Sequence, residues 1–183
     1  MSITRRAAIL RGALAATAFA QQPAKDQYPD AAPYVPTPIE VVEAILQLAN
    51  VGPGDVVYDL GCGDGRIVFM AAQKFGAAAV GVEIDSELVR EDRERAEKSG
   101  VAKKVRFLEA DLFQTDLRPA SVVTMYLLPK TVDRLKPKLL AELNPGARVV
   151  SFAFPISDWP PTKTVEVNTR RIYLWIVPER PKK

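Results

Sequence analysis

The stretch DLGCGDGR, residues 59–66, constrains the fold more than any other part of the sequence. The β-branched residues before it predict a strand near 55–60, and the apolar spacing after it predicts a helix near 65–75. A glycine-rich turn from a strand to a helix is where α/β folds hold nucleotide-like ligands. The sequence therefore predicts an α/β fold with a ligand site at this turn.

The rest of the chain repeats the alternation of strand and helix. We expect strands near 78–84, 105–110, 121–128 and 147–154, helices near 86–99 and 130–143, and two last strands near 164–168 and 171–177. This pattern predicts a Rossmann-like, doubly wound sheet of about seven strands, mostly parallel, with a C-terminal antiparallel hairpin. Pro137 is expected to kink or divide the helix near 130–143.

A further helix is predicted over 38–49, where the domain begins. Thr37 is expected to cap its N-terminus, with Pro38 in the first helical position and Glu40 as the capping-box acid. The apolar face of this helix would include Ile39.

Length and composition predict one domain without metal chemistry. A chain of 183 residues, 48% of them hydrophobic, is long enough for one packed core and too short for two. Because the sequence has one cysteine, Cys62, and no histidine, an internal disulfide and a cysteine zinc cluster are excluded, and the commonest general base is missing. We therefore expect no metal.

The charge of the chain is concentrated at its start. Residues 1–20 contain three arginines and no acid, so the remaining chain has 22 basic and 22 acidic residues and is neutral. A neutral body gives no indication of a nucleic-acid partner.

The first 20 residues predict an export signal. Arg5 and Arg6 precede an apolar run, and residues 18–20, Ala-Phe-Ala, fit a small-x-small cleavage site, so the segment resembles a bacterial twin-arginine leader. An amphipathic N-terminal helix and a misassigned start codon are the alternatives. We expect a linker over 21–33 and one domain over 34–183, with no stable membrane insertion of that domain. The expected location is exported or periplasmic, with the cytoplasm as the alternative.

The glycines of the turn lack the spacing of a dinucleotide site. Gly61, Gly63 and Gly65 form G-x-G-x-G, and Arg66 stands where the third glycine of G-x-G-x-x-G is expected. The spacing therefore weakens the prediction of a bound pyrophosphate.

Acidic residues lie at the ends of three successive predicted strands. Asp59 begins the glycine stretch, Glu83 ends the second strand 24 positions later, and Asp111 follows the third strand with the apolar Leu112 beside it. A carboxylate at the carboxyl edge of a sheet can accept hydrogen bonds from both ribose hydroxyls. Taken singly, Glu83 also fits a solvated loop acid and Asp111 a cap or turn residue. Together the three acids favour a binding site.

This constellation resembles the class I S-adenosylmethionine-dependent methyltransferases. The resemblance implies that Asp59 and the glycines of residues 61–65 surround the methionine part of S-adenosyl-L-methionine, that Glu83 binds its ribose, and that Asp111 and Leu112 lie near its adenine. The chemistry of the donor agrees, because it has no pyrophosphate but has an ammonium and a sulfonium, which carboxylates attract.

A narrower resemblance rests on three stretches. Tyr34-Val-Pro-Thr-Pro38, the run Tyr126-Leu-Leu-Pro129, and residues 135–146 are similar to the small protein-lysine methyltransferases of archaea and mitochondria. The Asn-Pro-Pro-Tyr type motif of enzymes that methylate adenine or glutamine amides is absent. The resemblance therefore implies a lysine amine of a protein as the acceptor, with Thr37 near the methionine end of the donor.

The proton of the amine needs an acceptor, and the candidates without histidine are Tyr126, Tyr34, Asp64 and water. Two other functions stay open from the sequence. One is a small-molecule methyltransferase on the same fold. The other is a noncatalytic, exported, nucleoside-binding protein. The export-like leader conflicts with a methyltransferase activity, because the methyl donor is made in the cytosol and an exported enzyme would lack an obvious supply of it.

The leader gives the first testable prediction. A reporter fused after Gln22 is expected to leave the cytosol, and changing both Arg5 and Arg6 to lysine is expected to retain it there, because twin-arginine recognition requires the arginine pair. Cell fractionation checks both results. A wild-type fusion that stays cytosolic would contradict the export prediction.

Overall fold

The computed structural model describes residues 34–180. The predicted leader over 1–20 and the linker over 21–33 lie outside the described residues. Within residues 34–180, no helix is both long enough and apolar enough to cross a membrane.

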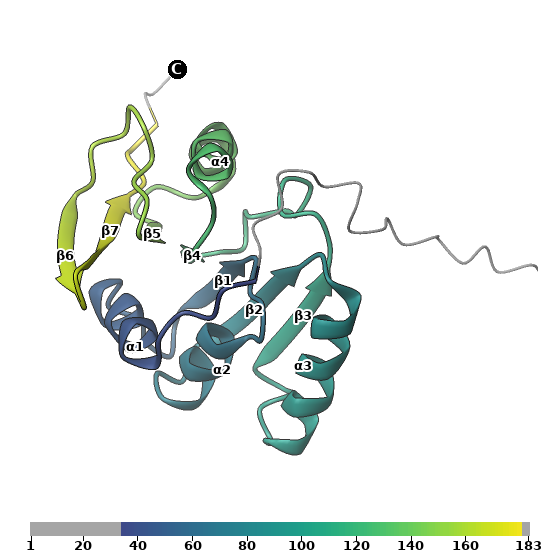
Figure 1. Cartoon of the computed structure of the whole chain (residues 1–183). Helices are drawn as coiled ribbons and strands as arrows, with labels where there is room; N and C mark the ends of the chain where they lie inside the picture. Colours follow the sequence, from purple (N-terminus) through teal and green to yellow (C-terminus); the bar gives the residue numbers. More distant parts are fainter. Residues whose placement is uncertain (1–33, 181–183) are drawn as a thin grey trace, which may run out of the picture.

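A seven-stranded sheet forms the centre of the molecule (Figure 1), and the prediction of an α/β fold is confirmed. The strands are β1 (Val56–Leu60), β2 (Ala78–Glu83), β3 (Val105–Glu109), β4 (Val122–Met125), β5 (Arg148–Phe152), β6 (Lys163–Val167) and β7 (Arg170–Ile176). Their order is β3-β2-β1-β4-β5-β7-β6. Strands β1 to β5 pair in parallel, and the predicted C-terminal hairpin adds β7 and β6 in antiparallel pairing.

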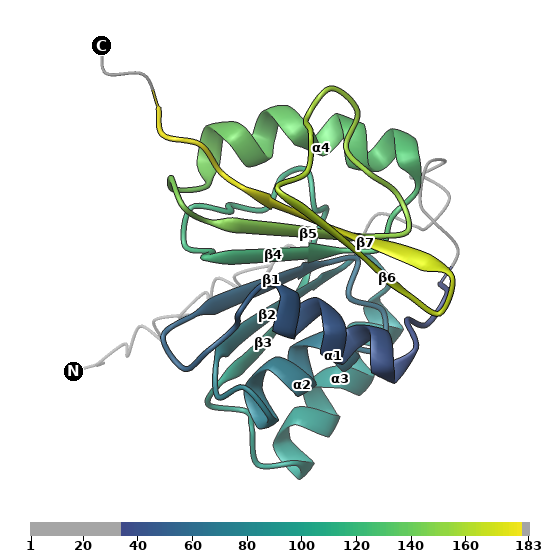
Figure 2. The same cartoon turned by 90° about the vertical axis from the view of Figure 1, so that its left-hand side faces the viewer.

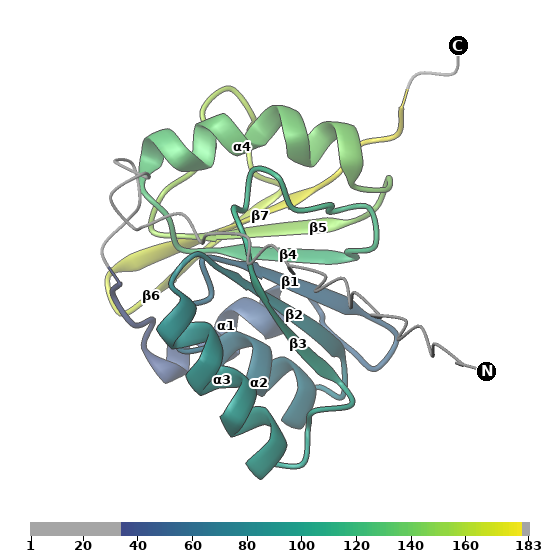
Figure 3. The same cartoon turned by 90° about the vertical axis from the view of Figure 1, so that its right-hand side faces the viewer.

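Helices cover both faces of the sheet. They are α1 (Ile39–Leu48), α2 (Arg66–Gln73), α3 (Ser86–Lys98) and α4 (Pro129–Glu142). Figures 2 and 3 show α1, α2 and α3 on one face and α4 on the other. Each face buries its own apolar core, one with residues of α1 to α3 and one with residues of α4. Successive strand residues contribute to opposite cores because side chains alternate along a strand.

The carboxyl ends of β1 to β4 lie at the same edge of the sheet because these strands are parallel. Leu60 of β1 is in register with Val82 of β2, and Glu83 of β2 is in register with Glu109 of β3. The loops that follow these strands therefore meet at one edge, where parallel α/β sheets bind ligands.

The predicted capping of the first helix is wrong. The helix begins at Ile39 with Pro38 as its N-cap residue and without a side-chain cap. Thr37 is buried, and its carbonyl accepts a hydrogen bond from Arg66. The Glu40 carboxylate accepts instead from the Asn168 side-chain amide at 2.7 Å. Tertiary contacts with α2 and the β6–β7 hairpin thus fix the start of α1, which has no side-chain cap.

Ile39 was also expected in the core, and this expectation is wrong. Its side chain is 55% exposed, whereas Val41, Val42, Ile45 and Leu46 form the buried face of α1. The helix therefore presents an apolar side chain to solvent at its first turn.

Pro137 does not divide α4, which runs from Pro129 to Glu142 with the proline inside it. Leu135 before the proline and Leu139 after it are both fully buried against the sheet. This packing stabilises the helix on both sides of the proline despite the missing amide hydrogen.

Two strands end earlier than predicted. The fourth strand stops at Met125 and not at residue 128, and β5 stops at Phe152, since Ala153 has a φ of 70°. The three residues after β4 are therefore free to form a loop at the ligand edge of the sheet.

Candidate functional site

The glycine turn begins directly after β1 and ends in α2. Gly61, Gly63 and Gly65 have φ values of 73°, 57° and 64°, a region that other residues rarely adopt. The amides of Gly61 and Cys62 both donate to the Val82 carbonyl, at 2.8 and 3.1 Å. These bonds fix the turn to the end of β2.

Close packing is a second reason for glycine at these positions. A Cβ atom on Gly63 would lie 2.5 Å from the Tyr34 ring, and one on Gly61 would lie 2.9 Å from Leu127. A Cβ atom on Gly65 would lie 2.6 Å from the Phe107 ring. The turn is therefore enclosed by side chains from three other parts of the chain.

The Glu83 carboxylate connects β2 to the glycine turn. Its Oε2 accepts from the Gly63 amide at 3.0 Å, and its Oε1 accepts from the amides of Ile84 and Asp85 at 2.8 and 3.0 Å. These bonds occupy three of about four acceptor positions of a carboxylate, which leaves Oε2 able to accept from a ligand. The structure thus brings together the turn and the acid that the sequence placed at a ribose.

Asp59 lies beneath the turn and is 3% exposed. Burial raises its pKa to about 7, although the Thr124 hydroxyl donates to its Oδ1 at 2.7 Å, and the charges of Glu83, Asp64 and Asp92 act in the same direction as burial. A cationic ligand beside Asp59 would favour its ionised form.

Asp64 and Arg66 form an ion pair within the turn. The Arg66 Nε and Nη2 donate to the two Asp64 carboxylate oxygens at 2.8 and 2.6 Å. Burial opposes ionisation of Asp64, but the hydrogen bonds and charge of Arg66 outweigh it and lower the pKa of this carboxyl. A lowered pKa makes Asp64 a weak proton acceptor for an amine.

The two candidate tyrosines come from different segments, Tyr34 from the chain before α1 and Tyr126 from the loop after β4. Tyr34 packs on Gly63, and burial and then the Asp64 charge raise the pKa of its hydroxyl. Tyr126 follows β4, with its ring centroid 4.7 Å from that of Phe152. Its hydroxyl oxygen accepts from Arg170 Nη1 at 2.8 Å, so the β7 strand positions this tyrosine.

Asp111 forms local hydrogen bonds after β3. Its Oδ1 accepts from the Phe113 amide at 2.8 Å and its Oδ2 from the Gln114 side chain at 3.5 Å. These are the contacts of a turn residue. Leu112 packs against the core on the α4 side of the sheet.

Sequence reasoning missed three residues that organise this site. Thr124 binds Asp59, Arg66 binds Asp64, and Arg170 binds Tyr126. A threonine inside a buried strand and an arginine in place of a glycine were detectable signals for the first two. Nothing in the sequence indicates Arg170, because the contact joins residues 44 positions apart.

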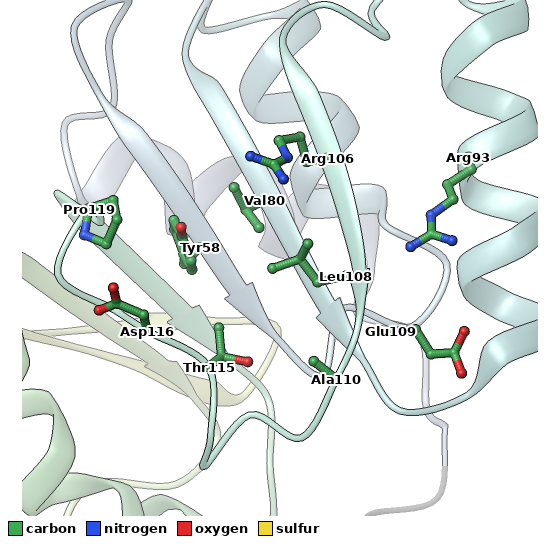
Figure 4. A pocket seen from close by; sticks show the side chains of 10 residues that line it. All are labelled: Tyr58, Val80, Arg93, Arg106, Leu108, Glu109, Ala110, Thr115, Asp116 and Pro119. Atoms are coloured by element: carbon green, nitrogen blue, oxygen red, sulfur yellow. The ribbon is translucent and has the colours of Figure 1, made fainter. Parts of the chain in front are cut away.

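A cavity of about 480 Å³ lies along β1 to β3, on the sheet face that α1 to α3 do not cover, and reaches the carboxyl end of β3 (Figure 4). It is lined by Tyr58, Val80, Arg93, Arg106, Leu108, Glu109, Ala110, Thr115, Asp116 and Pro119. Ala110 directly precedes Asp111, so the cavity adjoins the loop that the sequence assigns to adenine. Among residues 34–180, no group of three or more His, Cys, Asp or Glu side chains is placed to hold a metal ion.

Comparisons with known proteins agree with this site. Residues 59–163, more than half of the chain, match the ANTKMT methyltransferase domain family. A protein-lysine N-methyltransferase of Saccharolobus islandicus is 45% identical over 152 residues, which cover 80% of this chain and 94% of that protein. The chain belongs to this methyltransferase family.

Two further proteins are similar to this methyltransferase. The adenine nucleotide translocase lysine N-methyltransferase of Mus musculus is 39% identical over 79% of this chain, and the match spans 63% of that protein, less than two thirds of its length. The crystal structure of an RNA methyltransferase from Salinibacter ruber, in complex with S-adenosyl-L-homocysteine, aligns with a TM-score of 0.78 and 47% identity. That alignment covers 81% of this chain and 97% of the other.

The chain is thus an S-adenosylmethionine-dependent methyltransferase, and the site fits this donor. The tight, positive-φ turn leaves backbone close to a ligand, and the carboxylates of Asp59 and Glu83 suit a donor with two cationic groups.

The role of Glu83 is testable by substitution. Glu83→Ala is expected to weaken S-adenosylmethionine binding more than tenfold, because it removes a charged acceptor worth about 1.5–3 kcal/mol and the bond that holds Gly63. Titration calorimetry measures the effect. Glu94→Ala removes an exposed acid of α3 that pairs with Arg90; it is the control and is expected to bind normally. Equal affinities of the two variants would contradict the assignment of Glu83.

The raised pKa of Asp59 gives a pH prediction. Because the folded pKa of about 7 exceeds the usual 3.8, the proton on Asp59 stabilises the folded state at low pH, and this stability is lost as the pH rises through 7. Asp59→Asn removes the effect. Its free energy of unfolding, relative to the wild type, should therefore rise by about 2 kcal/mol between pH 5 and pH 8 in urea denaturation. A pH-independent difference would mean that Asp59 titrates normally.

Proposed function

We propose that this methyltransferase transfers a methyl group from S-adenosylmethionine to the side-chain amine of a lysine in a protein. The observation that carries the proposal is the 45% identity to the Saccharolobus islandicus protein-lysine N-methyltransferase over 94% of that protein. The mouse relative, a lysine N-methyltransferase of the adenine nucleotide translocase, supports the same acceptor.

The donor supplies an electrophilic methyl group on a sulfonium. Asp59 and the glycine turn would hold its methionine part, with Glu83 at the ribose and Leu112 near the adenine. Transfer in line requires the acceptor nitrogen about 3 Å from the methyl carbon, so most of the catalysis can come from positioning. The proposed reaction needs no metal.

In this proposal Tyr126 and Tyr34 orient the acceptor. The Tyr126 hydroxyl oxygen accepts one hydrogen bond from Arg170, which leaves it a second lone pair for an N–H of the lysine amine. Tyr34 lies over Gly63. Asp64 is engaged with Arg66, and the raised pKa of Tyr34 keeps its hydroxyl protonated, so water is the better candidate to receive the amine proton.

The surface around the turn supports a macromolecular acceptor. Four of the five large hydrophobic side chains that are most exposed within residues 34–180 belong to the segments that flank the turn: Tyr34, Val35, Ile39 and Leu128. Exposed apolar side chains that gather in one place indicate an interaction surface. A small polar acceptor would not require them.

The charge of the chain favours protein over RNA as the acceptor. Beyond residue 20 the basic and acidic residues are equal in number, whereas RNA binding requires a basic surface. The proposed acceptor is therefore a protein, whereas the Salinibacter ruber relative is named an RNA methyltransferase.

Labelling of a cell lysate tests the acceptor. The full chain is incubated with lysate and S-adenosylmethionine that has a labelled methyl group, and the labelled products are analysed by mass spectrometry. Label on lysine side chains is expected. Label confined to RNA, to small molecules, or to arginine or glutamine would overturn the proposal.

Variants of Tyr126 serve as controls for the same experiment. Tyr126→Ala is expected to lower methyl transfer at least about tenfold with little change in donor affinity, because it acts on the acceptor and not on the nucleoside. Tyr173 packs on Trp175 in the other core, and Tyr173→Phe is the matched control. A parallel loss of donor affinity and thermal stability in Tyr126→Ala would indicate that Tyr126 only packs α1 and the sheet.

A further inference from the structure

Arg66 makes a third contact that the donor site alone does not explain. Besides the two bonds to Asp64, its Nη1 donates to the Thr37 carbonyl at 2.5 Å. All three bonds use one planar guanidinium, and the Arg66 side chain is 24% exposed. The guanidinium fork therefore links the end of the glycine turn to the chain before α1.

The segment that Arg66 reaches, residues 34–38, is here called the strap. It lies beside the tip of β1 (Figure 1), with Thr37 buried and the Tyr34 ring directly on Gly63. Prolines at positions 36 and 38 limit the conformations of the strap. The strap therefore covers the glycine whose amide is bound to Glu83.

We propose that Arg66 is a positioning residue that fastens the strap over the bound donor. With the bond to Thr37 formed, Tyr34 stays on the turn and slows donor and product release. With the bond broken, the strap is held by packing and by the contact of the Tyr34 hydroxyl with Asp64, and the turn opens to solvent more readily. This role explains why arginine stands at the position of the last glycine of G-x-G-x-x-G, because an i to i+2 ion pair with Asp64 aims the guanidinium at the strap.

The chain contains a matched control for this fork. Arg118 donates through Nε and Nη2 to both oxygens of Asp116, two residues before it, at 2.8 Å each. This is the same local ion pair as in Asp64 and Arg66, but its side chains are exposed, and it lies in the loop between β3 and β4. Removing either arginine breaks an equivalent local pair, and only Arg66 also binds the strap.

Product release from the full chain tests the proposal. The dissociation rate of S-adenosylhomocysteine is measured by stopped-flow, together with the thermal unfolding midpoint, for Arg66→Gln and Arg118→Gln. Arg66→Gln is expected to release the product about tenfold faster, and Arg118→Gln less than twofold faster, because one charge-assisted bond is lost only in the first. Equal rates in the two variants would overturn the proposal.

Two further variants separate the strap from other roles of Arg66. Arg66→Lys keeps the charge but cannot bind Asp64 and Thr37 together, so it should resemble Arg66→Gln, and normal release would overturn the proposal. In a double-mutant cycle, Arg66→Gln should add little to Tyr34→Ala, because both act through the strap. Additive effects would indicate a direct contact of Arg66 with the donor. The measurement uses only product binding, so its result is independent of the acceptor.

Discussion

The hydrogen bond from the Gly63 amide to the Glu83 carboxylate is the contact on which the rest of the site depends. It joins the turn after β1 to the end of β2, and the two amides that donate to Val82 place the turn in the same register. The left-handed φ values of the three glycines make this path possible. These hydrogen bonds of the turn also position Asp59 below it and Tyr34 above it.

Acidic side chains gather around the glycine turn. Asp59 and Asp92 are both buried, and burial raises the pKa of each to about 7, with contributions from Glu83 and Asp64. The Asp92 Oδ2 is buried without a hydrogen-bond partner. Such a site disfavours its own ionised carboxylates in the absence of a cation. A donor with an ammonium and a sulfonium would relieve this repulsion, which links donor binding to the charge state of the protein.

The proposed acceptor side is assembled from segments far apart in the chain. Asn168 at the β6–β7 turn binds Glu40 at the start of α1, and Arg170 of β7 binds Tyr126 after β4. The hairpin thus positions both α1 and the loop after β4. The antiparallel hairpin that completes the sheet therefore also helps to shape the acceptor side of the site.

The sequence by itself determined the alternation of strands and helices, the glycine turn, and the acids at the ends of β1 and β2. These follow from local periodicity, from the φ values that only glycine adopts readily, and from the rule that parallel strands end at one edge. The tertiary structure decided what local patterns do not encode. Thr37 is not the cap because α1 begins one residue later than predicted, with Pro38 as its N-cap residue, and Pro137 stayed inside α4 because the sheet holds both halves of that helix. The hydrogen bond from Arg170 to Tyr126 was likewise unpredictable, because the two residues are 44 positions apart and only the folded sheet brings them together.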